Sequence, residues 1–241
     1  MPTPVVVSAG YSVVLATEPA EVRAAQELRY QVFGLELGAE LERVGIDTDR
    51  FDSLCDHLLI RDDRTGACVG TYRMLPPGRS AELYSDGEFR LDRLAHLRPE
   101  LVETGRSCVH PDHRSGAVIG LMWAGIARYM HLSGHQWLAG CASVPLFDGG
   151  DAAASTWAVI QAKHLAPDDL RVEPLHPWPA REGAPGASMI PPLLRGYLRL
   201  GAKVCGPPAH DPAFGTADFL VLLSMADVDE RYMRRFLGSG A

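Results

Sequence analysis

Two charged residues, Glu103 and Arg106, lie in the stretch "LVETGRSCVH" (101–110), which is otherwise typical of a buried strand. Burial can raise the pKa of a carboxyl group toward neutrality, and such a group can then act as a general base. We therefore predict that Glu103 accepts a proton during catalysis, directly or through a water, and that Arg106 orders it. The alternative is a salt bridge from Glu103 to Arg29, Arg73 or Arg106 without a catalytic role.

The strand is followed by a proline turn, an arginine, a glycine and a long apolar helix. The first N–H groups of a helix have no intrahelical acceptor, so together with the helix dipole they favour an anion at this position. The phosphate end of coenzyme A or of a phosphopantetheine arm would fit such a site. The alternative is an ordinary strand-to-helix connection in which the glycine only eases the turn and binds no ligand. The predicted donor-binding residues are Val109, His110, Arg114, Ser115, Gly116 and Ala117.

If the ligand at this site is an acyl thioester of coenzyme A or phosphopantetheine, transfer of its acyl group to an amine would need a deprotonated amine, a placed carbonyl, stabilisation of the developing charge and a leaving thiolate. An amine is a sufficient nucleophile, so a reactive cysteine is not required. We therefore interpret Cys108 and Cys141 as core residues. A nucleophile–base pair of Cys108 and His110 stays open as an alternative, because residues two apart on a strand share a face.

Composition narrows the classes of function. The chain has 241 residues and a net charge of −7 without a block of like charges, which argues against non-specific nucleic-acid binding. No run approaches the ~20 apolar residues of a spanning helix, and the first residues do not resemble a signal peptide. An odd number of cysteines without a CxxC pair favours a reducing compartment and argues against a zinc site. We expect a cytoplasmic protein; a peripheral contact with the inner face of the membrane stays open.

Hydrophobic periodicity and turn residues predict the elements that position these side chains. The strand–helix–strand unit at 101–144 requires a right-handed crossover and a locally parallel pair. The segment 173–192 is rich in proline and glycine and is expected to be a loop. We predict one domain over residues 1–241, of the α/β class with a mixed sheet. Strands are expected at 11–17, 56–62, 68–75, 101–110, 136–144, 203–206 and 218–228, and helices at 18–37, 90–98, 115–134, 151–165, 192–202 and 229–237.

Several segments within residues 11–235 are informative together, among them "LRYQVFGLELG", "DRFDSLCDHLLIRD", "ETGRSCVHPDHRSG" and "IPPLLRGYLRLGAKVCGPPAHDPAFGTADFLVLL". In type and order they resemble segments of the L-ornithine:acyl-carrier-protein N-acyltransferases, GNAT-like enzymes related to the acyl-homoserine-lactone synthases. The junction departs from the Arg/Gln-x-x-Gly-x-Gly/Ala motif of GNAT-type acyltransferases, because Gly116 follows Arg114 by two residues instead of three. The resemblance implies a GNAT-like fold with a central twisted mixed sheet flanked by helices.

The resemblance also implies a reaction, in which a fatty acyl group moves from acyl carrier protein to the α-amine of ornithine or a similar amino acid. The product would be a lyso-aminolipid, and no permanently bound cofactor or metal is expected. In the related lactone synthases, an acid-x-x-arginine in this strand and two further arginines form a charged cluster beside the site. The matching positions here are Glu103, Arg106, Arg29 and Arg73. Asp49 and Asp52 join them from the polar segment "RVGIDTDRFDSLC" (43–55), which we call the acidic loop.

Charge alone suggests how the acceptor is held. Arg73 or Arg106 could bind the carboxylate of the amino acid, and Asp49, Asp52 or Asp56 its side-chain ammonium. Phe33 could line an acyl channel or belong to the core. Two other interpretations stay open: an acyl-CoA-dependent enzyme acting on another amine, and a non-catalytic module that binds an acyl carrier or a lipid.

Overall fold

The computed structural model describes residues 6–8, 10–179 and 190–237, which fall into two compact units. The first unit comprises residues 1–79, 104–135 and 230–241, and the second comprises 80–103 and 136–229. The prediction of one domain for residues 1–241 stays a prediction. Residues 180–189 of the expected loop at 173–192 lie outside the described residues.

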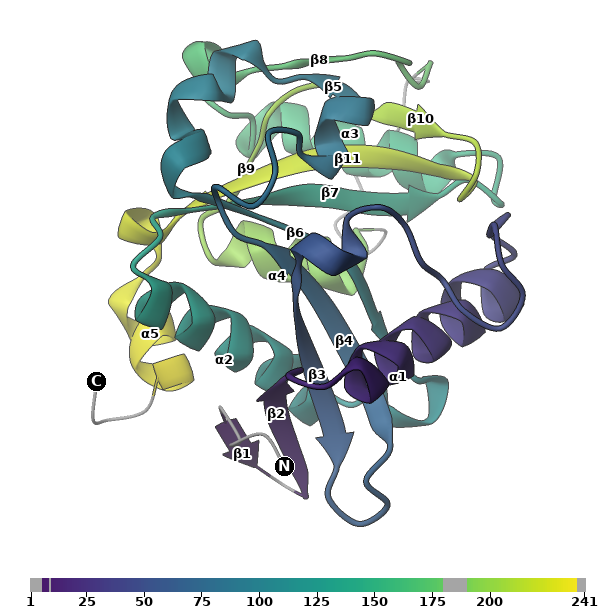
Figure 1. Cartoon of the computed structure of the whole chain (residues 1–241). Coiled ribbons are helices and arrows are strands. Elements are labelled where there is room, and N and C mark those ends of the chain that lie inside the picture. Colours follow the sequence, from purple (N-terminus) through teal and green to yellow (C-terminus); the bar gives the residue numbers. More distant parts are fainter. Residues whose placement is uncertain (1–5, 9, 180–189, 238–241) are drawn as a thin grey trace. The chain divides into compact units, whose positions relative to one another are not determined.

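The first unit contains a sheet of antiparallel strands in the order β1-β2-β3-β4, to which the end of β6 is added beside β4. Its helices are α1, a π-helix that follows it directly, α2 and α5 (Figure 1). The bounds are β1 Val6–Ser8, β2 Tyr11–Leu15, α1 Pro19–Arg29, the π-helix Tyr30–Glu36, β3 Asp56–Asp62, β4 Cys68–Leu75, β6 Leu101–Val109, α2 Gly116–Ser133 and α5 Glu230–Leu237.

Helices cover both faces of this sheet. Val14 packs with Ala25 of α1, which crosses in front of β3 and β4 in Figure 1. The neighbouring Val13 points to the opposite face, because side chains alternate along a strand, and there it meets α2 at Gly125. A Cβ added at Gly125 would lie 2.8 Å from Cγ1 of Val13. Glycine therefore permits the close approach of α2 to the sheet, and the strands are apolar on both faces.

The second unit is built on the long antiparallel pair β7–β11, which β10 and β9 extend. The first residues of β6, Leu101–Glu103, pair in parallel with Trp137–Ala139 of β7. β5 and β8 form a separate two-stranded ladder. The bounds are β5 Phe89–Arg90, β7 Trp137–Pro145, α3 Asp151–Lys163, β8 Glu173–Pro174, α4 Pro192–Arg199, β9 Lys203–Val204, β10 Ala209–Asp211 and β11 Thr216–Ser224.

The two faces of the β7–β11 pair have different neighbours. On one face, Ala139 and Leu220 belong to a core cluster with Phe89 and with leucines of the 90–101 segment. On the other face, the Phe219 ring lies 6.3 Å from the Trp157 ring of α3. This second unit therefore has its own apolar core.

The predicted elements are largely confirmed. The hairpin at 56–62 and 68–75, the strand at 101–110, the helix at 115–134 and the parallel β6–β7 pair are present. Two predictions need correction: the helix at 18–37 is α-helical only to Arg29, and the helix at 90–98 is a 3₁₀-helix at Asp92–Glu100 after a short strand. The mixed sheet flanked by helices agrees with the predicted fold class.

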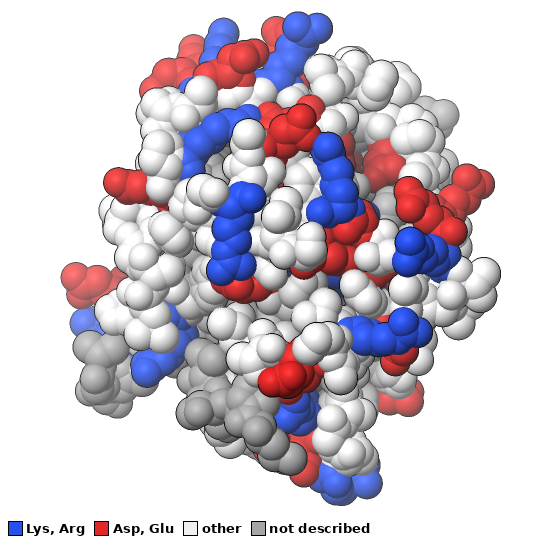
Figure 2. Space-filling view, in the orientation of Figure 1, with Lys and Arg blue, Asp and Glu red and all other residues white. Residues whose placement is uncertain are grey.

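Charged side chains of both signs are interspersed on the face shown in Figure 2. In the described ranges, no helix combines the length and the apolar character needed to cross a membrane.

Candidate active site

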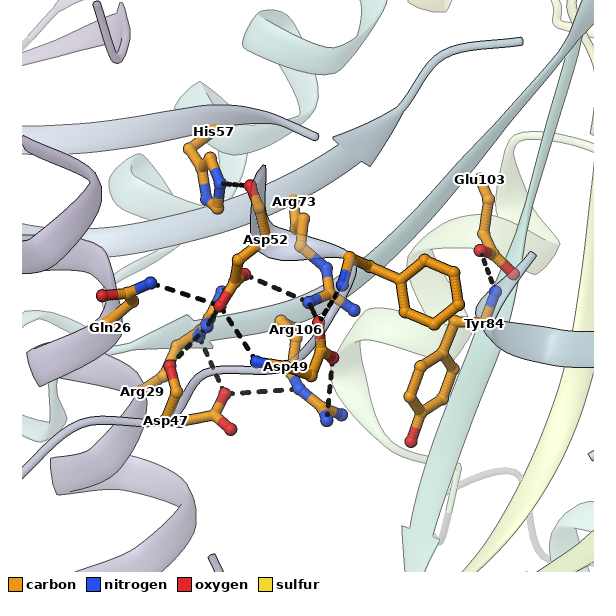
Figure 3. Close-up of polar contacts among 11 residues, drawn as sticks. Gln26, Arg29, Asp47, Asp49, Asp52, His57, Arg73, Tyr84, Glu103 and Arg106 are labelled. Carbon is orange, nitrogen blue, oxygen red and sulfur yellow. Dashed lines mark hydrogen bonds and ion pairs between the residues drawn. The ribbon is translucent and has the colours of Figure 1, made fainter. Parts of the chain in front are cut away.

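A cluster of buried charged residues lies in the first unit, where α1, the loop after the π-helix, β3, β4 and β6 converge (Figure 3). Arg29, at the end of α1, has no exposed surface. Its guanidinium donates two hydrogen bonds to Asp52, from Nη1 to Oδ1 at 2.9 Å and from Nη2 to Oδ2 at 2.7 Å. Its Nε lies 2.8 Å from Oδ2 of Asp47. The fork of the arginine therefore ties two points of the acidic loop to α1.

Two further arginines complete the cluster. Arg73 of β4 donates from Nη1 to Oδ1 of Asp49 at 2.6 Å and to Oδ1 of Asp52 at 3.1 Å. Arg106 of β6 lies 3.3 Å from Asp47 and 3.4 Å from Asp49. Three arginines and three aspartates thus alternate in one connected network (Figure 3), whose formal charges cancel.

Burial and ion pairing act in opposite directions on the pKa values of Asp52 and Arg73. Burial by itself would raise the pKa of Asp52, but the hydrogen bonds and charges of Arg29 and Arg73 outweigh burial and lower it. For Arg73, burial opposes the charged form, and the charge of Asp49 raises its pKa nevertheless. The buried His57 donates from Nε2 to the carbonyl oxygen of Asp52 at 2.9 Å, and burial lowers its pKa. His57 is therefore neutral near pH 7.

The accessible part of this cluster is small. Side-chain exposure is 20% for Asp49 and 13% for Arg106, against 6% for Asp52 and 0% for Arg29. A bound acceptor would reach Asp49 and Arg106 before the deeper pairs. The roles predicted for these residues stay predictions, and Arg29, Arg73 and Asp52 form the rigid base on which the outer pair rests.

Arg106 has an unusual backbone. Its φ of 50° is the one positive value among the non-glycine residues of the described chain, in the left-handed region that side chains other than glycine rarely adopt. The residue lies within β6 after Gly105, where an extended conformation would be expected. Strain of this kind persists where surrounding contacts hold it in place and is frequent at functional sites. Here the contacts with Asp47 and Asp49 hold the Arg106 side chain.

Glu103 lies on the part of β6 that belongs to the second unit, and it is 5% exposed. Its carboxylate accepts hydrogen bonds from Tyr84 N at 2.6 Å, Ser85 N at 2.8 Å and Ser85 Oγ at 2.6 Å. Figure 3 shows the contact with Tyr84. Donors of this kind favour the ionised carboxylate and weaken its affinity for a proton, so the contacts show Glu103 as the anchor of the 3₁₀ turn at Tyr84–Gly87. Its role as a base stays a prediction.

The strand-to-helix junction follows the predicted plan. Ser115 caps α2 by accepting a hydrogen bond from Val118 N at 3.4 Å, and Gly116 and Ala117 are exposed in the first turn. The sequence predicts a fixed positive charge at Arg114. In the structure its Nη1 and Nη2 each donate to a carboxylate oxygen of Glu36 at 2.6 Å, so this charge is balanced by a carboxylate.

Two more contacts fix the junction in place. The Nε of Arg114 donates to the Val109 carbonyl at 3.1 Å, and His110 N donates to the Val69 carbonyl at 2.8 Å. Arg114 therefore also ties the junction to the π-helix through Glu36. Donor binding at this place stays a prediction.

The remaining candidates lie in or next to cores. Phe33 packs against a cluster that contains Leu28, Val32 and Cys108. Burial raises the pKa of Cys108 above its usual range, which makes the thiol a poor nucleophile. Asp56 accepts from Arg79 at 2.7 Å and from the Tyr129 hydroxyl at 2.8 Å, outside the cluster.

Sequence reasoning missed Asp47 as a member of the cluster. The loop "RVGIDTDRFDS" contains three acids at short spacing, and the sequence does not tell which of them turn inward. Gln26 was also missed; its amide nitrogen donates to Oδ2 of Asp52 at 3.3 Å. It lies one turn before Arg29 on α1, on the same face of the helix. That spacing was the one available indication.

Known proteins resemble this chain over most of its length. Residues 28–124 match the acetyltransferase (GNAT) domain family. An L-ornithine N(alpha)-acyltransferase of Brucella abortus (strain 2308) is 36% identical over 91% of this chain and 86% of its own length. A protein of the same name from Rhodobacter capsulatus is 35% identical, with 95% of this chain and 97% of the relative covered.

Solved structures show the same fold. The AHL synthase LasI superposes with a TM-score of 0.55 at 14% identity, covering 97% of this chain and 98% of that chain. FeeM, an N-acyl amino acid synthase from uncultured soil microbes, gives a TM-score of 0.54 at 13% identity, with 89% and 91% covered. The GNAT-like fold class predicted from the sequence is confirmed.

Proposed function

We propose that this chain, which belongs to the L-ornithine N(alpha)-acyltransferase family, transfers an acyl group to the α-amine of L-ornithine. Family membership makes it an acyltransferase. The observation that carries the choice of acceptor is that four relatives, each 33–36% identical over more than nine-tenths of this chain, are named L-ornithine N(alpha)-acyltransferases. The residues that match the GNAT domain family, 28–124, span the charged cluster, Glu103 and the junction before α2.

The chemistry assigned to these residues is a direct transfer. The neutral α-amine attacks the thioester carbonyl, a C–N bond forms, and the C–S bond breaks when the tetrahedral intermediate collapses. Glu103 takes the proton that the amine loses, and the thiolate leaves and is protonated from solvent. Arg106, at the accessible end of the charged cluster, is the group proposed to meet the carboxylate of the acceptor.

The acyl donor in this proposal is a thioester of phosphopantetheine, carried by acyl carrier protein. Acyl-CoA shares the same arm, and one solved neighbour is a CoA-dependent acyl-homoserine lactone synthase. The exposed first turn of α2, with Ser115, Gly116 and Ala117, supports a phosphate site because its N–H groups point out of the helix. We further propose that the reaction takes place in the cytoplasm, with a peripheral contact to the membrane that receives the amphiphilic product.

A donor comparison tests the reaction. The purified protein is incubated with L-ornithine and either acyl-carrier-protein or CoA thioesters of one acyl chain, and free thiol and N-acylornithine are measured. Product from the carrier thioester at a higher kcat/KM supports the full proposal, and preference for CoA changes the donor only. Absence of product with both donors and several amines would favour a non-catalytic module that binds an acyl carrier or a lipid.

Two variants test the assigned roles. Glu103→Gln should lower kcat about 100-fold or more, the usual contribution of a general base, and should leave donor binding intact; the exposed Glu100 gives the matched control Glu100→Gln. Arg114→Ala should raise KM for the donor at nearly constant kcat, with Arg64→Ala as the control in an exposed turn. Unchanged turnover in Glu103→Gln would remove Glu103 from the mechanism.

A further inference from the structure

A second group of acidic residues lies in the second unit, apart from the residues discussed so far. Glu88 follows the 3₁₀ turn at Tyr84–Gly87, Cys141 lies on β7 and Asp218 lies on β11. One carboxylate oxygen from each acid and the Sγ atom of the cysteine all lie within 4.8 Å of one another. We call Glu88, Cys141 and Asp218 the acidic cluster.

The strand register explains how the cluster arises. Leu220 of β11 pairs with Cys141 of β7, and Asp218 pairs with Ser143. Side chains two apart on a strand share a face, so Asp218 and Cys141 point to the same side as the apolar core residue Leu220. That face is apolar near Leu220 and becomes polar toward Asp218. Glu88 approaches it from the segment that precedes β5.

The acids of this cluster lack a cationic partner. Both carboxylate oxygens of Glu88 are buried without a hydrogen bond of regular geometry among the described residues, and their polar neighbours are the Cys141 thiol and Asp218. Asp218 is 3% exposed and accepts a hydrogen bond from Thr216 Oγ1 at 2.7 Å. Burial, with the charges of Asp218 and Asp211, raises the pKa of Glu88, and burial likewise raises that of Asp218.

The first unit provides a direct contrast. There, the buried carboxylates of Asp47 and Asp52 pair with Arg29, so that each negative charge has a positive neighbour. A buried carboxylate without such a partner is costly and either takes a proton or binds a cation. The described residues supply no cation to the acidic cluster, so its carboxyl groups either hold a proton or bind a positively charged ligand.

The cluster is joined by hydrogen bonds to the proposed base. Ser85 Oγ donates to Glu103 at 2.6 Å and lies 3.4 Å from Sγ of Cys141. All these residues belong to the second unit. Glu88 and Cys141 keep part of their surface exposed, and Ser143, opposite Asp218, is exposed. The acidic cluster therefore lies at the edge of the core, next to partly exposed residues, with Glu103 only two side chains away.

We propose that Glu88 and Asp218 bind the side-chain ammonium of the diamino-acid acceptor while its α-amine is presented to Glu103. This inference rests on the proposed function, from which it takes the acceptor. A primary ammonium has three N–H donors, which the carboxylate oxygens of Glu88 and Asp218 can receive. The two acids thereby select an amino acid with a terminal amine over one with an alkyl side chain.

A metal ion fits the cluster less well. Metal binding by cysteine requires the thiolate, and burial together with the charge of Glu88 raises the pKa of Cys141 well above its usual range. An ammonium ligand needs only oxygen acceptors and leaves the thiol protonated. The assignment also replaces Asp49, Asp52 and Asp56 as binders of the ammonium, because these carboxylates already have arginine partners.

The test compares L-ornithine with L-norvaline, which has the same carbon chain without the side-chain amine. KM is measured by product formation, and binding of each amino acid is measured by calorimetry, for the wild type, Glu88→Gln, Asp218→Asn and the control Glu173→Gln. Glu173 is an exposed acid on β8 in the same unit. Far-UV circular dichroism and melting temperature establish that each variant is folded.

The wild type and the control should prefer ornithine about tenfold or more, the usual effect of hydrogen bonds to a charged group. Both cluster variants should lose this preference, with values for norvaline nearly unchanged. A folded variant that keeps the wild-type preference in both measurements overturns the inference, as does a wild type that binds and acylates the two amino acids equally. It is also overturned if Zn²⁺ or Mg²⁺ raises the melting temperature of the wild type only and ornithine does not.

The same design separates the inference from the proposed function. If the protein acylates no amine but binds ornithine selectively through Glu88 and Asp218, the proposed function fails and the binding site stands. If ornithine is acylated and Glu88→Gln keeps the preference, the function stands and the site fails. A wild type that neither acylates nor binds ornithine overturns both.

Discussion

The charged cluster makes the substitution Asp52→Asn a sharp test of how the first unit is held together. The asparagine keeps the shape of the side chain and removes its charge. Asp52 accepts two hydrogen bonds from Arg29 and one from Arg73, so its loss leaves three arginines facing two aspartates. The excess positive charge cannot move to solvent, because Arg29 is fully buried and Arg73 is 4% exposed.

The expected cost follows from this geometry. Removing one partner of a buried ion pair costs about 3–5 kcal/mol, since it leaves a buried charge uncompensated. For a chain of this size each kcal/mol corresponds to about 2–4 °C, so the melting temperature should fall by roughly 6–20 °C. An exposed acid in the same unit should matter little: Asp63→Asn, in the β3–β4 turn, is expected to change stability by less than about 0.5 kcal/mol.

The pH dependence supplies an independent check. The pKa of Asp52 is lower in the folded state than its unfolded value of about 3.9. The stability that it contributes is therefore fully present above pH ~4 and is lost as the pH falls toward the lower folded pKa. The gap between the wild type and Asp52→Asn should be largest near pH 7 and should narrow below pH ~4.

Urea unfolding followed by circular dichroism at pH 7 and at acid pH measures both quantities. A loss below about 1 kcal/mol at pH 7 would refute the reasoning, because it would mean that Arg29 finds another partner or solvent. If stability at pH 7 falls by the expected amount but the difference between the wild type and Asp52→Asn is the same at acid pH, the charged form of Asp52 is not the stabilising one.

Three further predictions follow from particular contacts. Gly125→Ala should lower stability by about 1–3 kcal/mol in thermal melts, because its Cβ would lie 2.8 Å from Val13 Cγ1. The control Gly120→Ala lies in the same helix with open space around it and should be neutral or stabilising in the same assay. Cys108→Ala should keep kcat within about twofold of the wild type, because the raised pKa of the thiol excludes it as a nucleophile; a large fall in a folded variant would revive a covalent mechanism. The pKa of Glu88 is raised in the folded state, so the stability that its protonated form contributes is present below the unfolded pKa and is lost as the pH rises through the folded pKa. Glutamine cannot ionise, so in the absence of ornithine Glu88→Gln should be more stable than the wild type at pH 8–9. At pH 4 the two proteins should have similar stability in urea unfolding.

Much of the fold was predictable because its determinants are local. The turn "DRTG" between two apolar runs specifies the β3–β4 hairpin, and Gly134, with a φ of 72°, ends α2 where the sequence placed the stop. The parallel pair of β6 and β7 follows from a strand–helix–strand unit that leaves little choice of topology. The π-helix after Arg29 was not predictable, because the spacing of apolar side chains distinguishes poorly between an α-helix and a π-helix, in which each hydrogen bond spans one more residue.

The site was predictable only in part. Residue types and the order of the segments pointed to Arg29, Arg73, Arg106, Asp49 and Asp52, and the structure joins these residues in one network. Their roles in binding and catalysis are a separate matter, since a network can position a substrate and also hold a fold.

What only the tertiary structure decided is which charges are compensated. The sequence contains many acids, and composition gives no means of telling that Asp47 is paired with an arginine. Nor does it tell that, within the described part of the chain, the buried Glu88 oxygens and the buried Asp218 have no arginine partner. The reason is physical: the free energy of a buried charge depends on partners and on loss of water, and both are set by residues distant in the chain. Sequence by itself determined the elements and the candidate chemistry; three-dimensional proximity determined which carboxylates need a cation.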